Sequence, residues 1–213
     1  MKKIAFYLGR LFSVIYPEGL KRLFDGLRRY IYTGYSTRGF RCWGKGSTVM
    51  PHWQDLRGKD CIQVGDYCLF YRDVELTAWT TYQNQTFSPQ IVIGNGCTIR
   101  NRNHITAINK IVIGNNLLTG PDVLITDNAH GLFDTSNAQR RPQDRELVSK
   151  GEVVIGDNVW IGEKATILPG VHIGNGVIIA ANSVVTNNIP DLCMAAGNPA
   201  KIVKNLNPQS RSV

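Results

Sequence analysis

The sequence contains no long apolar run. No stretch approaches the roughly 20 consecutive apolar residues that cross a bilayer. The apolar segment at the N-terminus is interrupted by Arg10, and no small-residue cleavage site follows it. We therefore expect neither a membrane span nor a signal peptide. The expected location is the cytoplasm, with peripheral contact at the inner face of the membrane as an addition.

Cysteine is scarce, and its spacing fits no metal site. The five cysteines form no Cys-x-x-Cys pair and match none of the zinc-ligand spacings. We expect reduced thiols that pack as small apolar residues, and no required metal. The four histidines are His52, His104, His130 and His172, and no two of them are close in the sequence.

Acidic residues are rare in the N-terminal segment. Residues 1–41 hold nine Lys or Arg against only Glu18 and Asp25, a net charge of +7 out of the +8 of the whole chain. The rest of the chain is close to neutral. A nucleic-acid binder would spread basic charge along a groove or reading element, with aromatic residues between. We therefore do not expect nucleic acid as a partner.

Aliphatic residues recur at every sixth position near the C-terminus. The series is Ile155, Ile161, Ile167, Ile173, Ile179 and Val185. The same frame returns earlier, with interruptions, from Val64, Ile93 and Ile113. A period of six fits neither an α-helix nor a simple hairpin array. It predicts a triangular coil in which each six-residue unit forms one strand and one corner, with the aliphatic side chain inside and each coil covering the next.

Two amphipathic segments precede this repeat. Helical spacing places apolar residues on one side of residues 2–16 and again of residues 18–32, with Pro17 between them. The stripe residues are Ile4, Leu8, Leu11 and Ile15, then Leu20, Leu23, Phe24, Leu27 and Ile31. We predict two short basic helices in an N-terminal arm, residues 1–45. We expect the arm to pack on the repeat or on a neighbouring subunit, and contact of residues 1–41 with an anionic membrane is the alternative.

A polar insertion, residues 128–152, interrupts the repeat. Insertions between repeats project as loops, and such loops often carry binding residues. His130 stands at the root of this insertion. A neutral imidazole is a suitable general base near neutral pH, so His130 is the candidate catalytic base. Its second ring nitrogen needs an orienting partner, which Asp127 or a backbone carbonyl could supply.

Three segments together resemble the hexapeptide-repeat acetyltransferases, in particular the branch of maltose, galactoside and polysaccharide O-acetyltransferases. They are ITDNAH, which ends at His130, VWIG in residues 159–162, and AAGNPAK in residues 195–201. The resemblance implies an all-β solenoid, a left-handed parallel β-helix, over residues 46–206. It also implies a homotrimer with active sites between neighbouring subunits. Residues 207–213 would then form a tail.

The resemblance also implies acetyl-CoA as the cosubstrate and direct transfer of its acetyl group, with His130 as the base and no metal. An asparagine assists near the acceptor in related enzymes, and Asn103 is its counterpart here, with Asn101 as the alternative. The residues expected to contact CoA are Trp160, Gly162, Ala180, Ala181, Thr186, Lys201 and Lys204. The chain departs from the commoner pattern in having lysine instead of arginine at the last two positions.

The resemblance favours an O-acetyltransferase acting on a saccharide hydroxyl. The nearest alternative is N-acetylation of an amino sugar or a nucleotide-linked amino sugar by the same base. Two remote alternatives are a non-catalytic β-helix and a metal-dependent hydratase like the γ-type carbonic anhydrases. The hydratase needs two histidines close together in sequence, and the non-catalytic protein needs neither His130 nor the AAGNPAK segment.

Overall fold

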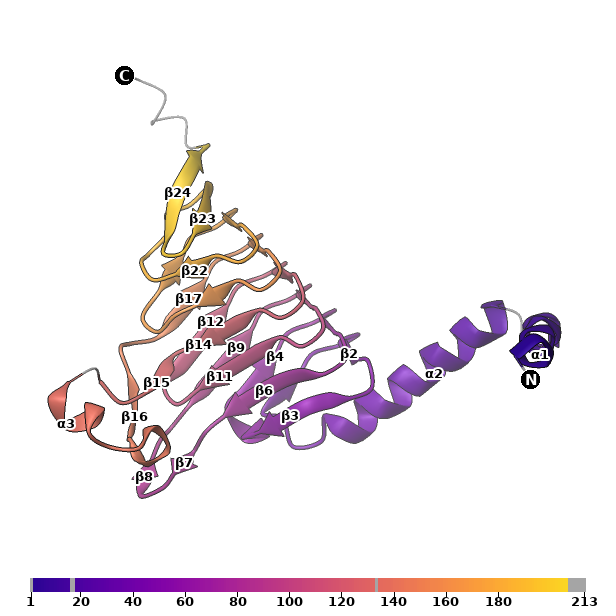
Figure 1. Cartoon of the computed structure of the whole chain (residues 1–213), viewed down its shortest axis with the longest axis horizontal. Coiled ribbons are helices and arrows are strands. Elements are labelled where there is room, and N and C mark those ends of the chain that lie inside the picture. The colour runs from indigo at the N-terminus through magenta and orange to yellow at the C-terminus, as the bar shows by residue number, and fades with distance from the viewer. Residues whose placement is uncertain (1, 16–17, 133, 207–213) are drawn as a thin grey trace.

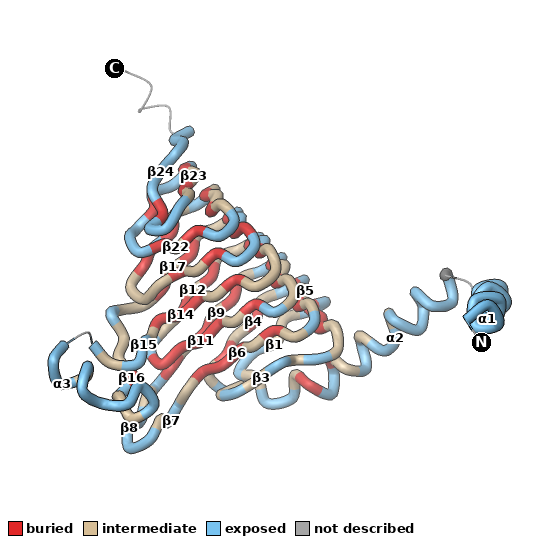
Figure 2. Tube along the Cα trace, viewed as in Figure 1, coloured by how far each residue is buried: buried red, intermediate tan, exposed pale blue. Residues whose placement is uncertain are grey.

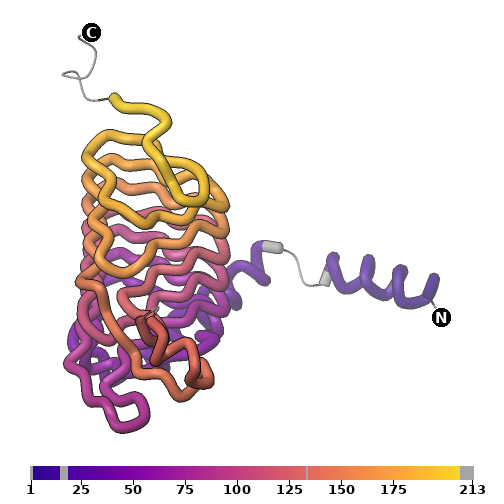
Figure 3. Tube along the Cα trace, turned by 60° about the vertical axis from the view of Figure 1, so that its left-hand side comes forward, coloured from indigo at the N-terminus to yellow at the C-terminus, as the bar shows by residue number. Residues whose placement is uncertain are grey.

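The computed structural model describes residues 2–15, 18–132 and 134–206. Its main body is a stack of coils whose short strands form three parallel sheets (Figures 1 and 3). The first sheet contains β1 (Cys42–Trp43), β4 (Ile62–Val64), β9 (Gln90–Ile93), β12 (Lys110–Ile113), β17 (Val153–Ile155) and β20 (His172–Ile173). The second contains β2 (Thr48–Val49), β5 (Leu69–Phe70), β10 (Thr98–Ile99), β13 (Leu118–Thr119), β18 (Trp160–Ile161), β21 (Ile178–Ile179), β23 (Cys193–Gly197) and β24 (Ala200–Asn205). The third contains β3 (Trp53–Arg57), β6 (Val74–Ala78), β11 (His104–Ala107), β14 (Leu124–Thr126), β19 (Thr166–Ile167) and β22 (Val184–Val185).

Successive strands of the chain belong to the three sheets in turn. Thus β9, β10 and β11 lie in the first, second and third sheets, and β12, β13 and β14 repeat that order. The coil strands pair in parallel with the strand one coil away, as Ile105 does with Leu76 and Ile125. The terminal strand β24 is the exception and pairs antiparallel with β23. This three-sided rotation is what the six-residue period predicts. We refer to the stack below as the prism.

The interior of the prism is built from the periodic aliphatic residues. All six residues of the C-terminal series are buried, and Figure 2 shows the buried positions recurring in every coil. Because side chains on neighbouring coils occupy equivalent positions, each aliphatic residue packs between two others. Ile125, for example, pairs with Ile105 on one side and Ile167 on the other. Burial of this kind supplies the main stabilisation of stacked repeats.

A ladder of Asn and Asp side chains follows the corner after the first sheet. Each side-chain oxygen accepts a hydrogen bond from the backbone N–H of the ladder residue in the adjacent coil, at 2.6 to 2.9 Å. The bonds join Asp66 to Asn95, Asn95 to Asn115, Asn115 to Asp157, Asp157 to Asn175 and Asn175 to Asp191. The Gly-Asn pairs of the sequence therefore bond one coil to the next, besides forming a turn.

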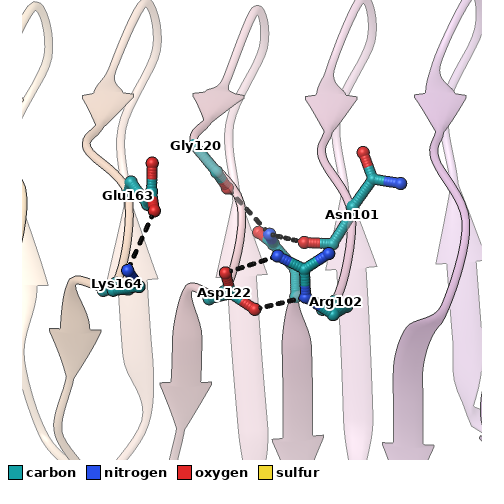
Figure 4. Close-up of polar contacts among 7 residues, drawn as sticks. Asn101, Arg102, Gly120, Asp122, Glu163 and Lys164 are labelled. Atoms are coloured by element: carbon teal, nitrogen blue, oxygen red, sulfur yellow. Dashed lines mark hydrogen bonds and ion pairs between the residues drawn. The ribbon is translucent and has the colours of Figure 1, made fainter.

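The corner after the second sheet carries left-handed residues. Asp73, Arg102, Asp122, Lys164 and Asn182 all have φ between 54° and 60°. The first four alternate in charge along the stack, and Figure 4 shows the bidentate pair between Arg102 and Asp122, with both N···O distances 2.7 Å. The hydrogen bond from Arg102 lowers the pKa of the Asp122 carboxyl below its usual value.

The N-terminal arm consists of the two predicted helices, α1 (Lys2–Ile15) and α2 (Glu18–Ser36), the second ending four residues later than expected. Only the end of α2 is fixed to the prism. The Tyr32 hydroxyl accepts from the Trp53 N–H at 3.0 Å, and the Thr33 hydroxyl accepts from the Val49 N–H at 2.9 Å. The rest of the arm projects away from the prism of its own chain (Figure 1). Packing on a neighbouring subunit, the other part of that expectation, stays a prediction. Among the described residues, no helix is long and apolar enough to cross a membrane.

Two antiparallel hairpins interrupt the coils. The first pairs β7 (Thr81–Tyr82) with β8 (Gln85–Thr86), and the second pairs β15 (Asn128–His130) with β16 (Leu147–Ser149). Short helices complete the structure: η1 (Lys59–Cys61) near the base of the prism, and α3 (Thr135–Ala138) and η2 (Pro142–Asp144) within the second hairpin. The polar insertion is thus largely ordered. Residues 207–213, predicted to be a tail, lie outside the described residues.

Candidate active site

The insertion is fastened at its root by the β15–β16 hairpin. Ala129 pairs with Val148, and His130 pairs with Leu147. Leu147 is the one buried residue among the described residues of 128–152. Its side chain is buried at the root of the insertion, whereas His130 on the opposite strand is exposed. The hairpin therefore holds the candidate base at a defined place on the surface.

The β7–β8 hairpin is hydrogen-bonded to the insertion. The Gln85 side chain accepts from the Leu147 N–H at 2.7 Å and donates to the Leu147 carbonyl at 3.0 Å. The Gln83 amide donates to the Gln143 carbonyl at 2.6 Å, and the Tyr82 hydroxyl donates to the same carbonyl at 2.9 Å. Two segments about sixty residues apart in the chain are thereby held together.

Tyr82 contacts the His130 imidazole. The two rings meet edge to face with centroids 5.5 Å apart, and the Tyr82 hydroxyl lies 3.4 Å from Nδ1 of His130. Because this hydroxyl donates its proton to Gln143, its oxygen is left as an acceptor for an Nδ1–H. That arrangement favours the tautomer in which Nε2 carries the free lone pair.

A cavity of about 200 Å³ opens beside His130. Three adjacent strands of the third sheet form one wall, on which Asp55, Glu75 and His104 follow one another in register. Each carboxylate faces a cation or an imidazole. Arg57 Nε lies 2.7 Å from Asp55, and His104 Nε2 lies 3.7 Å from Glu75. Trp79 and Tyr82 supply aromatic faces, so the cavity combines hydrogen-bonding groups with flat apolar surface.

A second cavity of about 370 Å³ lies on the other side of the same hairpin. The lining alternates along the strands, since His130 and Leu147 face the first cavity while Ala129 and Val148 face the second. This follows from the two-residue period of extended strands. Thr186, one of the predicted CoA contacts, lines the second cavity.

The structure gives Asn103 and Asp127 other bonds than those expected. The buried Asn103 amide donates to the Gly120 carbonyl at 2.8 Å, one coil away. The buried Asp127 carboxylate accepts from the N–H groups of Ile108 and Asn109, both at 2.9 Å. These contacts favour structural roles, and the catalytic roles stay predictions. Sequence reasoning missed Tyr82 as the partner of His130, because 48 residues separate the two.

The cysteines show no sign of a nucleophile. All five are free, and Cys68 and Cys97 stack on adjacent coils inside the prism. A hydrogen bond with Cys97 lowers the pKa of the Cys68 thiol to about 7, and the same bond, with burial, raises the pKa of Cys97. Cys68 is only 1% exposed, so its thiol is out of reach of a substrate. In the described parts of the chain, no group of three or more potential metal ligands occurs.

Residues 152–187 match the model of the bacterial transferase hexapeptide (six repeats). This part of the chain therefore carries the hexapeptide repeat. WbbJ of Escherichia coli K12, provisionally named as a lipopolysaccharide biosynthesis O-acetyl transferase, is 43% identical over 111 residues, 51% of this chain and 57% of that protein. The galactoside O-acetyltransferase of the same organism is 35% identical over 106 residues, 47% of each chain. The chain spans about half the length of the curated relatives it matches.

Among solved structures, AntD of Bacillus cereus, an N-acyltransferase in complex with dTDP and 3-hydroxybutyryl-CoA, has a TM-score of 0.62 to this protein. The likeness covers 83% of this chain and 89% of that chain, at 17% identity. At that identity it shows the fold alone. Proteins named for transfer to oxygen and proteins named for transfer to nitrogen both occur among the similar proteins.

The hexapeptide repeat aligns two of the predicted CoA contacts on one exterior row of the second sheet. Trp160 pairs with Ile178, Ile178 with Met194, and Met194 with Lys204. Trp160 and Lys204 are both exposed on this row, and Lys201 is exposed on the same terminal strand as Lys204. An apolar ring and two ammonium groups thus share one face.

Close packing between coils explains why position 162 of the hexapeptide repeat is a glycine. A Cβ at Gly162 would lie 2.5 Å from the backbone nitrogen of Ala181 and 2.9 Å from the carbonyl carbon of Ala180. The next coil therefore forbids a side chain there, with or without a ligand. Ala180 is half-buried and Ala181 is exposed, so the second alanine is the better placed for an outside contact.

Proposed function

We propose that this protein is an acetyl-CoA-dependent O-acetyltransferase that acts on a saccharide hydroxyl. The fold would be the left-handed form of the three-sided parallel β-helix, assembled as a homotrimer with active sites between copies. The observation that carries the proposal is the exposed His130 imidazole, oriented by Tyr82, at the edge of a polar and aromatic cavity. The names of the similar proteins support acetyl transfer as the reaction.

His130 would act as the general base. An alcohol is a weak nucleophile, so Nε2 of His130 removes the hydroxyl proton as the oxygen attacks the thioester carbonyl carbon. The C–O bond forms, the C–S bond then breaks, and the proton on His130 passes to the departing thiolate. A backbone N–H of a coil turn would stabilise the charge that develops on the carbonyl oxygen. No acyl-enzyme is needed.

The cavity beside His130 would hold the acceptor sugar. Asp55 and Glu75 present carboxylate oxygens that can accept hydrogen bonds from sugar hydroxyls, and Trp79 offers a flat apolar face. Glu75 and His104 form a polar pair within this wall. A saccharide, which has many hydroxyls and apolar ring faces, fits this combination of groups.

The CoA side would lie along the exterior row that ends in the terminal lysines. Lys201 and Lys204 would meet the phosphates as point charges, without the fork that arginine supplies. Trp160 would form an apolar wall, and the small residues Gly162, Ala180 and Ala181 would allow the pantetheine arm to approach closely. Thr186, at the second cavity, would contact the arm beside the hairpin.

The test is His130→Ala, assayed by thiol release from acetyl-CoA with a panel of neutral and amino sugars. We expect kcat to fall about 100- to 10,000-fold, as expected for loss of a general base. Because His130 is exposed, the melting temperature and the oligomeric state should not change. The matched control is His172→Ala, which removes an exposed imidazole on β20.

The products distinguish the candidate reactions. Mass spectrometry of an acetylated neutral sugar supports transfer to oxygen. An amide formed only with amino sugars contradicts the O-acetyltransferase assignment and supports N-acetylation. Undiminished turnover by His130→Ala would remove His130 from the mechanism.

A further inference from the structure

The N-terminal arm carries an apolar surface that its own chain leaves open. Every large apolar residue of α1 whose side chain is described is between 48% and 77% exposed. These residues are Ile4, Phe6, Tyr7, Leu8, Leu11, Phe12 and Val14. A surface of this size on a monomer is unusual unless something covers it.

Helix α2 carries a second apolar stripe, on the side that faces away from the prism. Tyr32, Thr33 and Ser36 are at helical spacing and contact the prism, which fixes one face of α2. The apolar stripe of the same helix falls on the opposite face, since its residues are offset by about half a turn. Leu23, for example, is 67% exposed. The prism to which α2 belongs therefore cannot cover the stripe.

The charge of the arm indicates which partner covers its apolar surface. Residues 1–41 carry +7, whereas the rest of the chain is nearly neutral. A second copy of the arm would bring the same positive charge against the first, and the body of a neighbouring subunit offers no net negative charge to attract it. An anionic surface carries the negative charge that attracts a basic arm. Basic residues beside an apolar stripe are the composition of helices that lie in a membrane interface.

We propose that residues 2–31 bind the surface of an anionic phospholipid bilayer. The apolar stripes of α1 and α2 enter the boundary between headgroups and acyl chains, and the side chains of Lys2, Lys3, Arg10 and Lys21 contact lipid phosphates. Arg22, Arg28 and Arg29 instead line a cavity between α2 and the prism. Neither helix is long and apolar enough to span the bilayer, so the contact is peripheral. The anchored end of α2 then holds the prism close to the lipid surface.

The proposal is tested with the full chain and two kinds of vesicle, one of phosphatidylcholine and one of equimolar phosphatidylcholine and phosphatidylglycerol. Cosedimentation should give at least about tenfold tighter binding to the anionic vesicles, because each basic residue near such a surface adds attraction. Added salt should weaken that preference by screening. Equal binding to both vesicles, or binding to neither, overturns the proposal.

The triple variant Ile4→Ser, Leu8→Ser and Leu11→Ser tests the stripe separately from the charge. These side chains lie outside the core, so the melting temperature should stay that of the parent protein. Vesicle binding should fall at least about tenfold, as removal of three inserted side chains requires. Unchanged binding by this variant contradicts the proposal.

A matched control removes three exposed apolar residues elsewhere, by Ile202→Ser, Val203→Ser and Leu206→Ser. This control should bind vesicles as the parent does. Light scattering on both triple variants adds a second readout. The arm variant could lose its assembly state while the parent protein fails to bind vesicles. That result would mean that a second copy covers the stripe and that the membrane assignment is wrong.

Discussion

The coils of the prism and the insertion are held in place by different kinds of contact. Within the prism each periodic aliphatic side chain is buried between two others, and the backbone bonds repeat from coil to coil. The insertion, residues 128–152, buries only Leu147 among its described residues and is held by polar contacts with the β7–β8 hairpin. The candidate base lies in the insertion. Stability and the proposed chemistry therefore rest on different parts of the chain, and loops of this kind can change without loss of the fold.

The largest difference between the two regions should appear on truncation of an apolar side chain. Ile125→Ala removes a residue that is 0% exposed between Ile105 and Ile167, and should cost about 2–5 kcal/mol of unfolding free energy. Leu132→Ala in the insertion, at a residue 54% exposed, should change it by about 0.5 kcal/mol or less. Denaturant unfolding measures both. Similar losses of unfolding free energy in the two variants would contradict the proposed difference between the coils and the insertion.

A smaller effect is expected where the two hairpins meet. Tyr82→Phe keeps the ring against His130 but removes the hydroxyl that bonds Nδ1 and the Gln143 carbonyl. We expect kcat to fall about tenfold, equivalent to about 1.4 kcal/mol, with KM nearly unchanged, because the imidazole loses its orienting partner.

Gln83→Ala is the matched control for Tyr82→Phe. It removes the other side-chain bond to the Gln143 carbonyl and leaves the tyrosine in place. Steady-state kinetics of both variants measure the difference. An equal fall in kcat would mean that Tyr82 acts by holding the hairpin and not by orienting His130.

The smallest effect concerns the charged corner of the prism. Asp122→Asn keeps a residue type that tolerates the left-handed conformation and removes the charge that pairs with Arg102. The melting temperature at neutral pH should fall slightly, by the equivalent of about 0.5 kcal/mol, as for exposed ion pairs.

The pH dependence of this pair has a definite sign. Because the folded-state pKa of Asp122 is lowered, the stabilisation is present above the pKa of the unfolded carboxyl and disappears as the pH falls through the folded-state pKa. The parent and Asp122→Asn should therefore converge in acid. A melting-temperature difference between the parent and Asp122→Asn that persists in acid, or that does not change with salt concentration, would show that the Asp122 charge does not cause it.

The regular parts of the molecule were predictable from local pattern. The series from Ile155 to Val185 specifies the coil because a side chain every six residues can stay buried only if strand and corner repeat with that period. The spacing from Ile4 to Ile31 specifies two helices for the same kind of reason. His130 at the root of the insertion was likewise visible as a candidate base.

The sequence by itself thus determined the elements whose order comes from neighbours in the chain: the coil period, the two helices and the position of the polar insertion. The tertiary structure alone decided the hydrogen-bonded Asn and Asp ladder, the meeting of Tyr82 with His130, and the commitment of Asn103 and Asp127 to backbone groups. These contacts join residues 16 to 48 positions apart. No local period records such a pairing, because it depends on how coils and hairpins come to lie side by side.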